Sequence, residues 1–146
     1  MATKYESAKL ILELYNLRRE TKMREARDFW ITFNPETIED LMTAMGGPQS
    51  GYVRRVISYW DMAAALVAND AIDAKMFHET GGEMLVVFGK IEHLIPKVRE
   101  AMMPTAWKNL EDVALGFPNA RQTIDGIKAR LKGAIAARAA AAQTAA

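Results

Sequence analysis

The segment from Ser50 to Phe77, SGYVRRVISYWDMAAALVANDAIDAKMF, is the most apolar long part of this chain and decides its fold. Apolar residues recur in it at steps of three and four, the period of one helix face. They are Val53, Val56, Ile57, Trp60, Ala63, Ala64 and Val67. Tyr59, Met62 and Leu66 widen that face beyond a simple stripe. The pattern predicts a central core helix that is buried on most sides.

Both ends of this helix carry sequence signals. Ser50 is a favourable N-cap, because its side-chain oxygen can accept a hydrogen bond from a backbone N–H of the first turn. Asn69-Asp70 predicts the end of the helix, and Asp73 is expected to cap the next one.

Composition limits the class of protein. The chain of 146 residues has the length of one domain, which we expect to span residues 1–146. It contains no cysteine, so disulfides and thiolate chemistry are excluded. Nineteen basic and eighteen acidic residues leave a net charge of +1, so no overall field attracts nucleic acid or an anionic membrane. Basic residues are in marked excess only over residues 121–146.

No targeting or membrane segment is expected. The first residues are polar and charged, unlike those of a signal peptide. The longest uninterrupted apolar run, Met62 to Ala68, is far shorter than the roughly 20 residues that span a bilayer. The sequence therefore predicts a soluble, cytoplasmic protein.

Residues 4–33 contain neither Pro nor Gly, which predicts a long N-terminal helix. A helix of about 30 residues is about 45 Å long, more than the core of a small domain. It must therefore kink near Glu20, or one end must project and pack on another chain.

Gly and Pro predict shorter helices in the middle of the chain. Asn34-Pro35 is expected to start a helix that ends at Met45. A second helix is expected over 83–103, with a kink at Pro96.

The C-terminal part completes the expected fold. One short helix is predicted over 104–115, and Asn119 should cap the last one, whose Ala-rich tail frays at about 138–146. The run MLVVF has no second strand to pair with, so no sheet is expected. The fold class is an all-α bundle of five to seven helices.

The triplet Tyr59-Trp60-Asp61, the following aliphatic run, Ala71-Ile72-Asp73, Phe77 and the later Pro96-Lys97-Val98-Arg99 form a family-like pattern. Over about residues 50–104 it resembles a group of uncharacterised bacterial helical proteins known only as a domain of unknown function. In that group the acid of the triplet is usually Glu, whereas this chain has Asp61. The resemblance implies an α-helical fold and no particular activity.

One candidate site is a buried acid or a metal centre formed by Asp61, His78, Glu79 and Glu83 around the break at Gly81-Gly82. Carboxylate-bridged metal sites in helical bundles use Glu-x-x-His on two helices, and neither histidine has a Glu three residues before it. The alternative is that these are ordinary polar positions at a helix interruption.

A second candidate is an anion site at Ser50, Arg54 and Arg55, where a glycine-rich turn leads into a helix N-terminus. It lacks the Lys-Ser/Thr ending of a P-loop, so a plain connection between helices is the alternative. The same segment can be interpreted as a helix-turn-helix, although its second helix is very apolar for a DNA groove.

Self-association is the functional feature that the N-terminal helix favours. Apolar residues surround this helix, and Ile11, Leu14 and Leu17 exceed what one core-facing stripe needs. We therefore expect a homodimer through these residues, and binding of another protein remains open.

The sequence as a whole favours a helical interaction or scaffold module over an enzyme. No catalytic residues and no cofactor are predicted. The alternative function is a nucleic-acid-binding regulator that uses Arg54, Arg55 and the basic C-terminal helix, and a small-ligand or metal-binding protein comes third.

Overall fold

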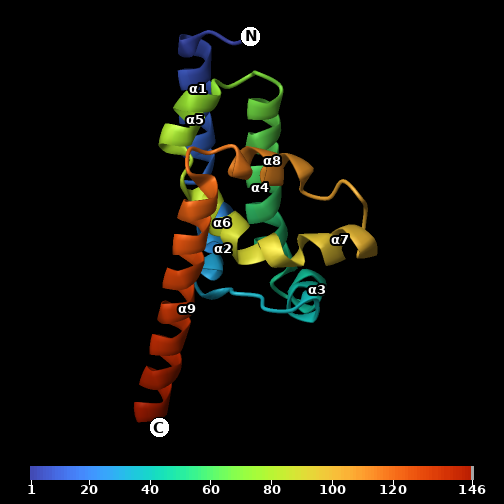
Figure 1. Ribbon diagram of the computed structural model, residues 1–146, viewed down its shortest axis with the longest axis vertical. Helices are drawn as coiled ribbons and strands as arrows, with labels where there is room; N and C mark the ends of the chain where they lie inside the picture. The colour runs from blue at the N-terminus through green and yellow to red at the C-terminus, as the bar shows by residue number, and fades with distance from the viewer. Residues whose placement is uncertain (146) are drawn as a thin grey trace.

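The computed structural model describes residues 1–145, and over these residues the protein is all-α, with no strand (Figure 1). Its elements are α1 Lys4–Leu17, α2 Thr21–Thr32, α3 Ile38–Gly46, α4 Ser50–Ala68, α5 Ala74–Thr80, α6 Glu83–Ile91, the 3-10 turn η1 Glu92–Leu94, α7 Ile95–Ala101, α8 Lys108–Leu115 and α9 Ala120–Thr144. The all-α class is confirmed, but the expected number of five to seven helices was too low. The longest helix is the C-terminal α9, with 25 residues, and not the N-terminal one.

The N-terminal segment is two helices, because Glu20 starts a new one. The Glu20 carboxylate accepts a hydrogen bond from the Met23 N–H at 2.9 Å and so caps α2. The backbone N–H groups of Arg18 and Arg19 donate to the carbonyl oxygens of Tyr15 and Asn16, respectively, which closes α1 in a tight turn. The predicted kink near Glu20 is thus a complete break between α1 and α2.

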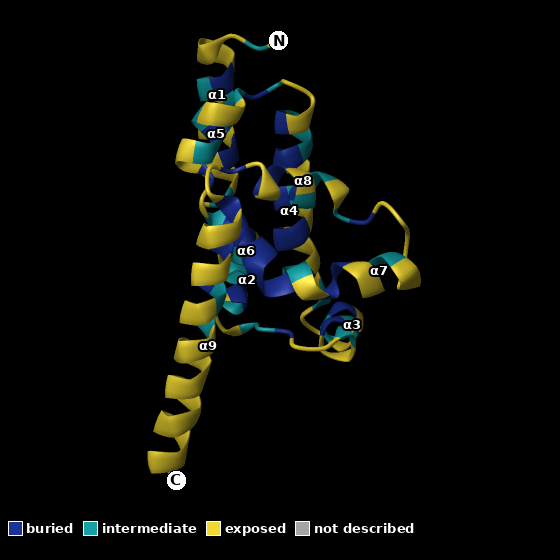
Figure 2. Cartoon of the chain, in the orientation of Figure 1, coloured by how far each residue is buried: buried dark blue, intermediate teal, exposed yellow. Residues whose placement is uncertain are grey.

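Helix α4 is the central helix, as predicted, and packs against α2, α3 and α8. The predicted face is buried, including Trp60 at 1% exposed and Val53 at 0%. Tyr59 is buried as well, whereas Met62 is exposed, so one side of α4 faces solvent (Figure 2). Burial of these side chains supplies most of the stabilisation in this part of the fold.

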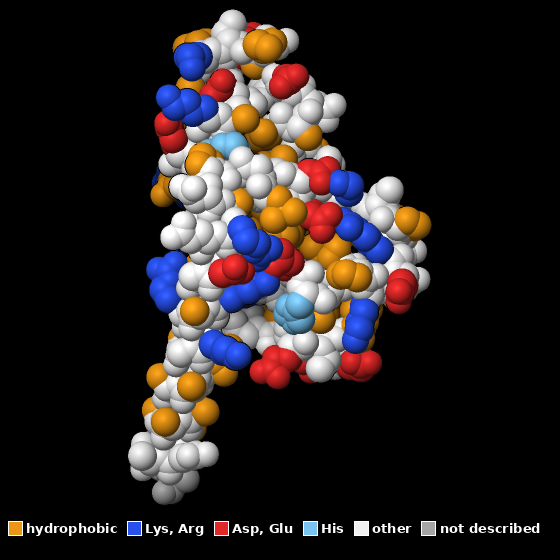
Figure 3. Space-filling view, viewed as in Figure 1, with side chains coloured by type: hydrophobic (Ala, Val, Ile, Leu, Met, Phe, Trp, Pro, Cys, Tyr) orange, Lys and Arg blue, Asp and Glu red, His pale blue; other side chains and the backbone are white. Residues whose placement is uncertain are grey.

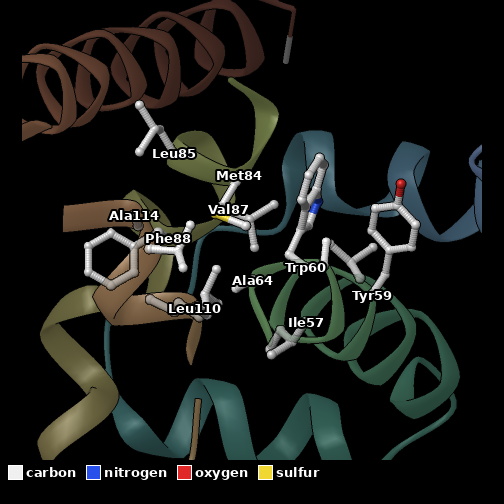
Figure 4. Packing of buried hydrophobic residues seen from close by; sticks show 14 of the residues in the cluster. Ile57, Tyr59, Trp60, Ala64, Met84, Leu85, Val87, Phe88, Leu110 and Ala114 are labelled. Carbon is white, nitrogen blue, oxygen red and sulfur yellow. The ribbon is translucent and has the colours of Figure 1, made fainter. Parts of the chain in front are cut away.

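Figure 4 shows side chains of α4 meeting those of α6 and α8 in the core. The labelled residues are Ile57, Tyr59, Trp60 and Ala64 from α4, Met84, Leu85, Val87 and Phe88 from α6, and Leu110 and Ala114 from α8. The run MLVVF that could have been a strand therefore forms the buried face of helix α6.

The caps of α4 and α5 follow the prediction in part. Asp73 caps α5 by accepting a hydrogen bond from the Met76 N–H at 2.8 Å. Ser50 is not the N-cap of α4 but its first residue, and its hydroxyl oxygen accepts a hydrogen bond from Arg54 Nε at 3.0 Å. Gln49 precedes it without a side-chain cap.

Helix α3 begins later than expected. Thr37 and Asp40 form a reciprocal capping box, with Asp40 N–H donating to Thr37 Oγ1 at 3.1 Å and Thr37 N–H donating to Asp40 at 2.9 Å. This arrangement satisfies two backbone donors at once, so the helix starts at Ile38 and Asn34-Pro35 remains in the connection.

The helix expected over 83–103, with a kink at Pro96, is instead divided into separate helices. Helix α6 stops at Ile91, η1 follows, and Pro96 lies in the first turn of α7, where its missing N–H costs nothing. Helix α8 starts at Lys108 instead of Pro104, directly after Trp107 in the left-handed region with φ of 55°.

Helix α9 packs with its first half only. Ala120, Ile124 and Ile127 are buried against the body, whereas every residue of 132–145 is exposed (Figure 2). The helix continues to Thr144, as the high intrinsic helix propensity of alanine favours, and fraying at about 138–146 stays a prediction. Residue 146 lies outside the described residues.

None of the described helices combines the length and the apolar character that a membrane span requires.

Candidate functional site

A groove of about 720 Å³ lies along α9. Its walls are residues 34–36, Gly89 and Lys90 of α6, His93 of η1, and the part of α9 from Lys128 to Ile135. We call it the α9 groove. Figure 3 shows Lys and Arg side chains gathered where α9 passes the body. A smaller hollow of about 260 Å³ continues it toward Arg138 and shares Asn34, Glu36 and Ile135 with it.

Lys90 is the charged residue at the base of this groove. It is 6% exposed, and its ammonium group donates to three carbonyl oxygens at the end of α2: those of Trp30, Ile31 at 3.5 Å and Phe33 at 3.3 Å. A cation is favourable at this end of a helix, where the last carbonyls lack partners. Lys90 therefore closes α2 from a different helix.

No carboxylate forms an ion pair with Lys90 within residues 1–145. Burial and, to a lesser extent, the positive charge of Arg138 lower the pKa of Lys90 to about 8. Sequence reasoning missed this residue. The available signal was a single lysine in the apolar run that forms the buried face of α6.

Glu92 holds α9 against η1. It accepts two hydrogen bonds from the Arg121 guanidinium, at 2.6 and 2.8 Å, and also pairs with Lys128. These bonds from Arg121, followed by those from Lys128, lower the pKa of Glu92 to about 2. The charge of Lys128 is therefore balanced, whereas Lys132 and Arg138 form no ion pair in the part of the chain described.

The four residues proposed for a metal or acid site are not brought together. Glu83 pairs with Arg27 at 3.1 Å and with Arg18 at 3.4 Å. Asp61 accepts a hydrogen bond from the Leu110 backbone N–H at 2.9 Å, and among residues 1–145 it forms no ion pair.

His78 and Glu79 line a separate hollow beside Phe117. The His78 ring lies 4.4 Å from the Phe117 ring, and burial lowers the pKa of His78. Over residues 1–145 no group of three or more His, Cys, Asp or Glu side chains is placed to hold a metal ion.

Two residues of the expected anion site already form hydrogen bonds within the protein. Arg54 donates to Ser50 Oγ at 3.0 Å and to the Met45 carbonyl oxygen at 3.3 Å, so it joins the start of α4 to the end of α3. Arg55 is exposed. Arg54 therefore has a structural role between α3 and α4.

The three residues expected to mediate self-association lie in different environments. Leu14 is 6% exposed and belongs to the core, Ile11 is half-buried, and Leu17 is 52% exposed. The most exposed apolar side chains of α1 are instead Tyr5 at 73% and Leu12 at 69%.

Helix α1 is anchored on its inner side by polar contacts. The Tyr59 hydroxyl donates to the Leu14 carbonyl oxygen at 2.5 Å, and Arg18 Nε donates to that hydroxyl oxygen at 3.2 Å. The Arg18 guanidinium also lies 4.7 Å from the centre of the Trp60 ring, a cation–π distance. The Asp73 backbone N–H donates to the hydroxyl of Ser7 on α1 at 2.8 Å.

Fold and surface together define an all-α protein with an apolar helix face and a basic groove, and with no metal cluster among the residues described. Over residues 5–117 the chain matches the family model described as Domain of unknown function (DUF4760), and it belongs to that family. The resemblance recognised in the sequence is thereby confirmed. No curated protein and no solved structure matches the chain.

The matched residues end at Phe117, before α9 begins at Ala120. The α9 groove therefore has one wall inside the family domain and one wall outside the matched residues.

Proposed function

We propose that this protein is a helical interaction module that self-associates through the outer face of α1. The observation that carries this proposal is a line of apolar side chains on that face, formed by Tyr5, Ala8, Leu12 and Tyr15. We call it the α1 stripe. Tyr5, Leu12 and Tyr15 are 73%, 69% and 59% exposed, and aromatic side chains are enriched at protein interfaces.

The spacing of the α1 stripe suits a second copy of the same helix. Its members are separated by three, four and three residues, so the pattern is the same in both directions. Two α1 helices that cross antiparallel about a two-fold axis would place Tyr5 opposite Tyr15 and Ala8 opposite Leu12. Leu12 would then face the small Ala8 and the two tyrosines would face each other, so that the same patch meets itself as a two-fold interface requires.

The inner side of α1 is held by the contacts of Ser7 and Leu14, so the stripe is presented on a fixed helix. A fixed helix loses little conformational freedom on association. One helix of 14 residues is nevertheless smaller than a standard interface, which buries about 800 Å² on each partner. We therefore expect a dimer that dissociates on dilution.

Sedimentation velocity over a dilution series tests the proposal. The wild-type protein should shift from dimer to monomer as its concentration falls. Leu12→Glu should be monomeric throughout, because it places two charges in the centre of the interface, and its far-ultraviolet circular dichroism should match that of the wild type.

Leu17→Glu is the matched control, since Leu17 is exposed on the same helix but lies outside the α1 stripe. It should leave the dimer intact. A monomeric wild type at all concentrations would refute self-association. Dissociation by Leu17→Glu and not by Leu12→Glu would move the interface to the side of Ile11 and Leu17.

Nucleic-acid binding by Arg54, Arg55 and the basic part of α9 has weaker support, because Arg54 is already bonded to Ser50 and Met45. Salt-dependent retention on heparin would favour this alternative, since phosphate contacts release counterions.

A further inference from the structure

We propose that the α9 groove binds a small amphipathic carboxylate, an anion with an apolar body such as a medium-chain fatty acid. This binding function is separate from self-association through α1. It rests on three features of the groove: unbalanced positive charge, apolar walls and a suitable volume.

Positive charge is in excess along the groove. Lys90, Lys128 and Lys132 line it, and Arg138 lines its continuation. Glu36 is the one carboxylate in the lining of these two hollows, and the carboxylate that balances Lys128 is Glu92. The net excess attracts an anion.

Lys132 and Arg138 offer the hydrogen bonds to such an anion. The three protons of Lys90 already face the carbonyl oxygens of α2, so Lys90 contributes its charge and not a free donor. Its charge is buried without a carboxylate partner, a situation that is costly and that a bound anion relieves. The guanidinium of Arg138 suits a carboxylate, because it can donate two parallel hydrogen bonds.

Most of the remaining lining is apolar: Pro35, Gly89, Ala129, Leu131 and Ile135, beside the polar Asn34 and His93. Leu131 packs against the core and Ile135 is 36% exposed, so both present apolar surface in the groove. An alkyl chain laid along α9 would remove this apolar surface from water, which favours binding.

The volume of the groove is that of a small-molecule site. Its value of about 720 Å³ lies within the usual range of about 300–1,000 Å³. Only the first half of α9 packs on the body, and the groove occupies the point where α9 begins to leave it.

Isothermal titration calorimetry with laurate, kept below its critical micelle concentration, tests the proposal on the chain of 146 residues. Dodecyltrimethylammonium has the same chain length and the opposite charge, and acetate has the charge without the chain. Laurate should bind, and neither of the other two should bind measurably.

Two charge variants give effects of opposite sign. Lys132→Glu should weaken laurate binding about tenfold, and Glu36→Gln should strengthen it about twofold to fivefold. Lys97→Glu is the control, because Lys97 is exposed on α7 and lies outside the groove. It should leave the affinity unchanged.

The apolar wall is tested in the same way. Ile135→Ser should weaken laurate binding several-fold through lost apolar contact, whereas Met62→Ser, at an exposed position of α4, should not. The proposal is overturned if laurate does not bind, if dodecyltrimethylammonium binds as tightly, or if Lys132→Glu and Lys97→Glu have equal effects.

Discussion

The carboxylate of Asp61, in the middle of α4, accepts a hydrogen bond from the backbone N–H of Leu110 at 2.9 Å. Leu110 is the third residue of α8, and the N-cap position of that helix is Trp107, which has no side-chain cap. Asp61 thus supplies the missing cap across 49 positions of sequence. The acid of the Tyr59-Trp60-Asp61 triplet has a structural role in joining α4 to α8.

Replacing Asp61 should destabilise the protein through α8. We expect Asp61→Ala to lower the free energy of unfolding by about 1–2 kcal/mol, and Asp61→Asn by less, because its amide oxygen can still accept the bond. Urea denaturation followed by circular dichroism measures both. Asp112→Ala, at an exposed acid of α8, should change stability by less than about 0.5 kcal/mol. Equal losses in Asp61→Ala and Asp112→Ala would refute the capping role.

The buried Lys90 should make stability depend on alkaline pH. Its pKa is about 8 in the folded protein against 10.5 when unperturbed, so above pH 8 the unfolded state holds more protons. Stability contributed by this group therefore rises from pH 8 toward 10.5, by up to about 3 kcal/mol. Urea denaturation of wild type and Lys90→Met at several pH values should show this rise in the wild type only. A parallel profile in Lys90→Met would contradict it, and Lys97→Met should keep the wild-type rise.

Glu92 should affect stability at acidic pH. Its folded pKa is about 2 against 4.5 when unperturbed, so its contribution is complete above pH 4.5 and is lost as the pH falls through 2. Glu92→Gln should lower the free energy of unfolding at pH 7 by about 1 kcal/mol, since the partner Arg121 is half exposed and solvent weakens the pair. At pH 2 the variant and the wild type should be equally stable. Glu100→Gln, at an exposed position of α7, is the control, and a loss that persists at pH 2 would argue against an ionic origin.

Leu14 and Leu12 should respond differently to the same substitution. Leu14→Asp puts a charge into the core and should cost several kcal/mol, enough to unfold much of the protein. Leu12→Asp changes an exposed side chain and should cost less than about 0.5 kcal/mol. Thermal unfolding at low protein concentration, where the proposed dimer is dissociated, compares the two. Similar melting temperatures would show that Leu14 is not a core residue.

The sequence was informative wherever the signal was local. The helical period of α4 predicted its buried face, and Asp73 predicted the start of α5, because a side-chain cap three residues from its donor needs no tertiary contact. The sequence signal at Asn34-Pro35 was misleading about where α3 starts. The nearby Thr37 and Asp40 form a better cap, because they exchange two reciprocal hydrogen bonds.

The candidate sites were harder to predict, because distant residues form them. Glu83 has the chemistry of a metal ligand, but Arg18 and Arg27, 65 and 56 positions away, use its carboxylate. Leu14 and Leu12 are equally apolar, and only the contact of α1 with the body decides which of them is buried.

The sequence by itself determined the helical class, the central helix and the family, since these depend on periodicity, helix propensity and residue pattern along the chain. Only the tertiary structure decided that Lys90 closes α2 and that α9 forms a groove with α6 and η1. Burial and long-range hydrogen bonds set these features, and both depend on which side chains meet after folding. The same apolar or charged residue can therefore become a core residue, a cap or a binding group.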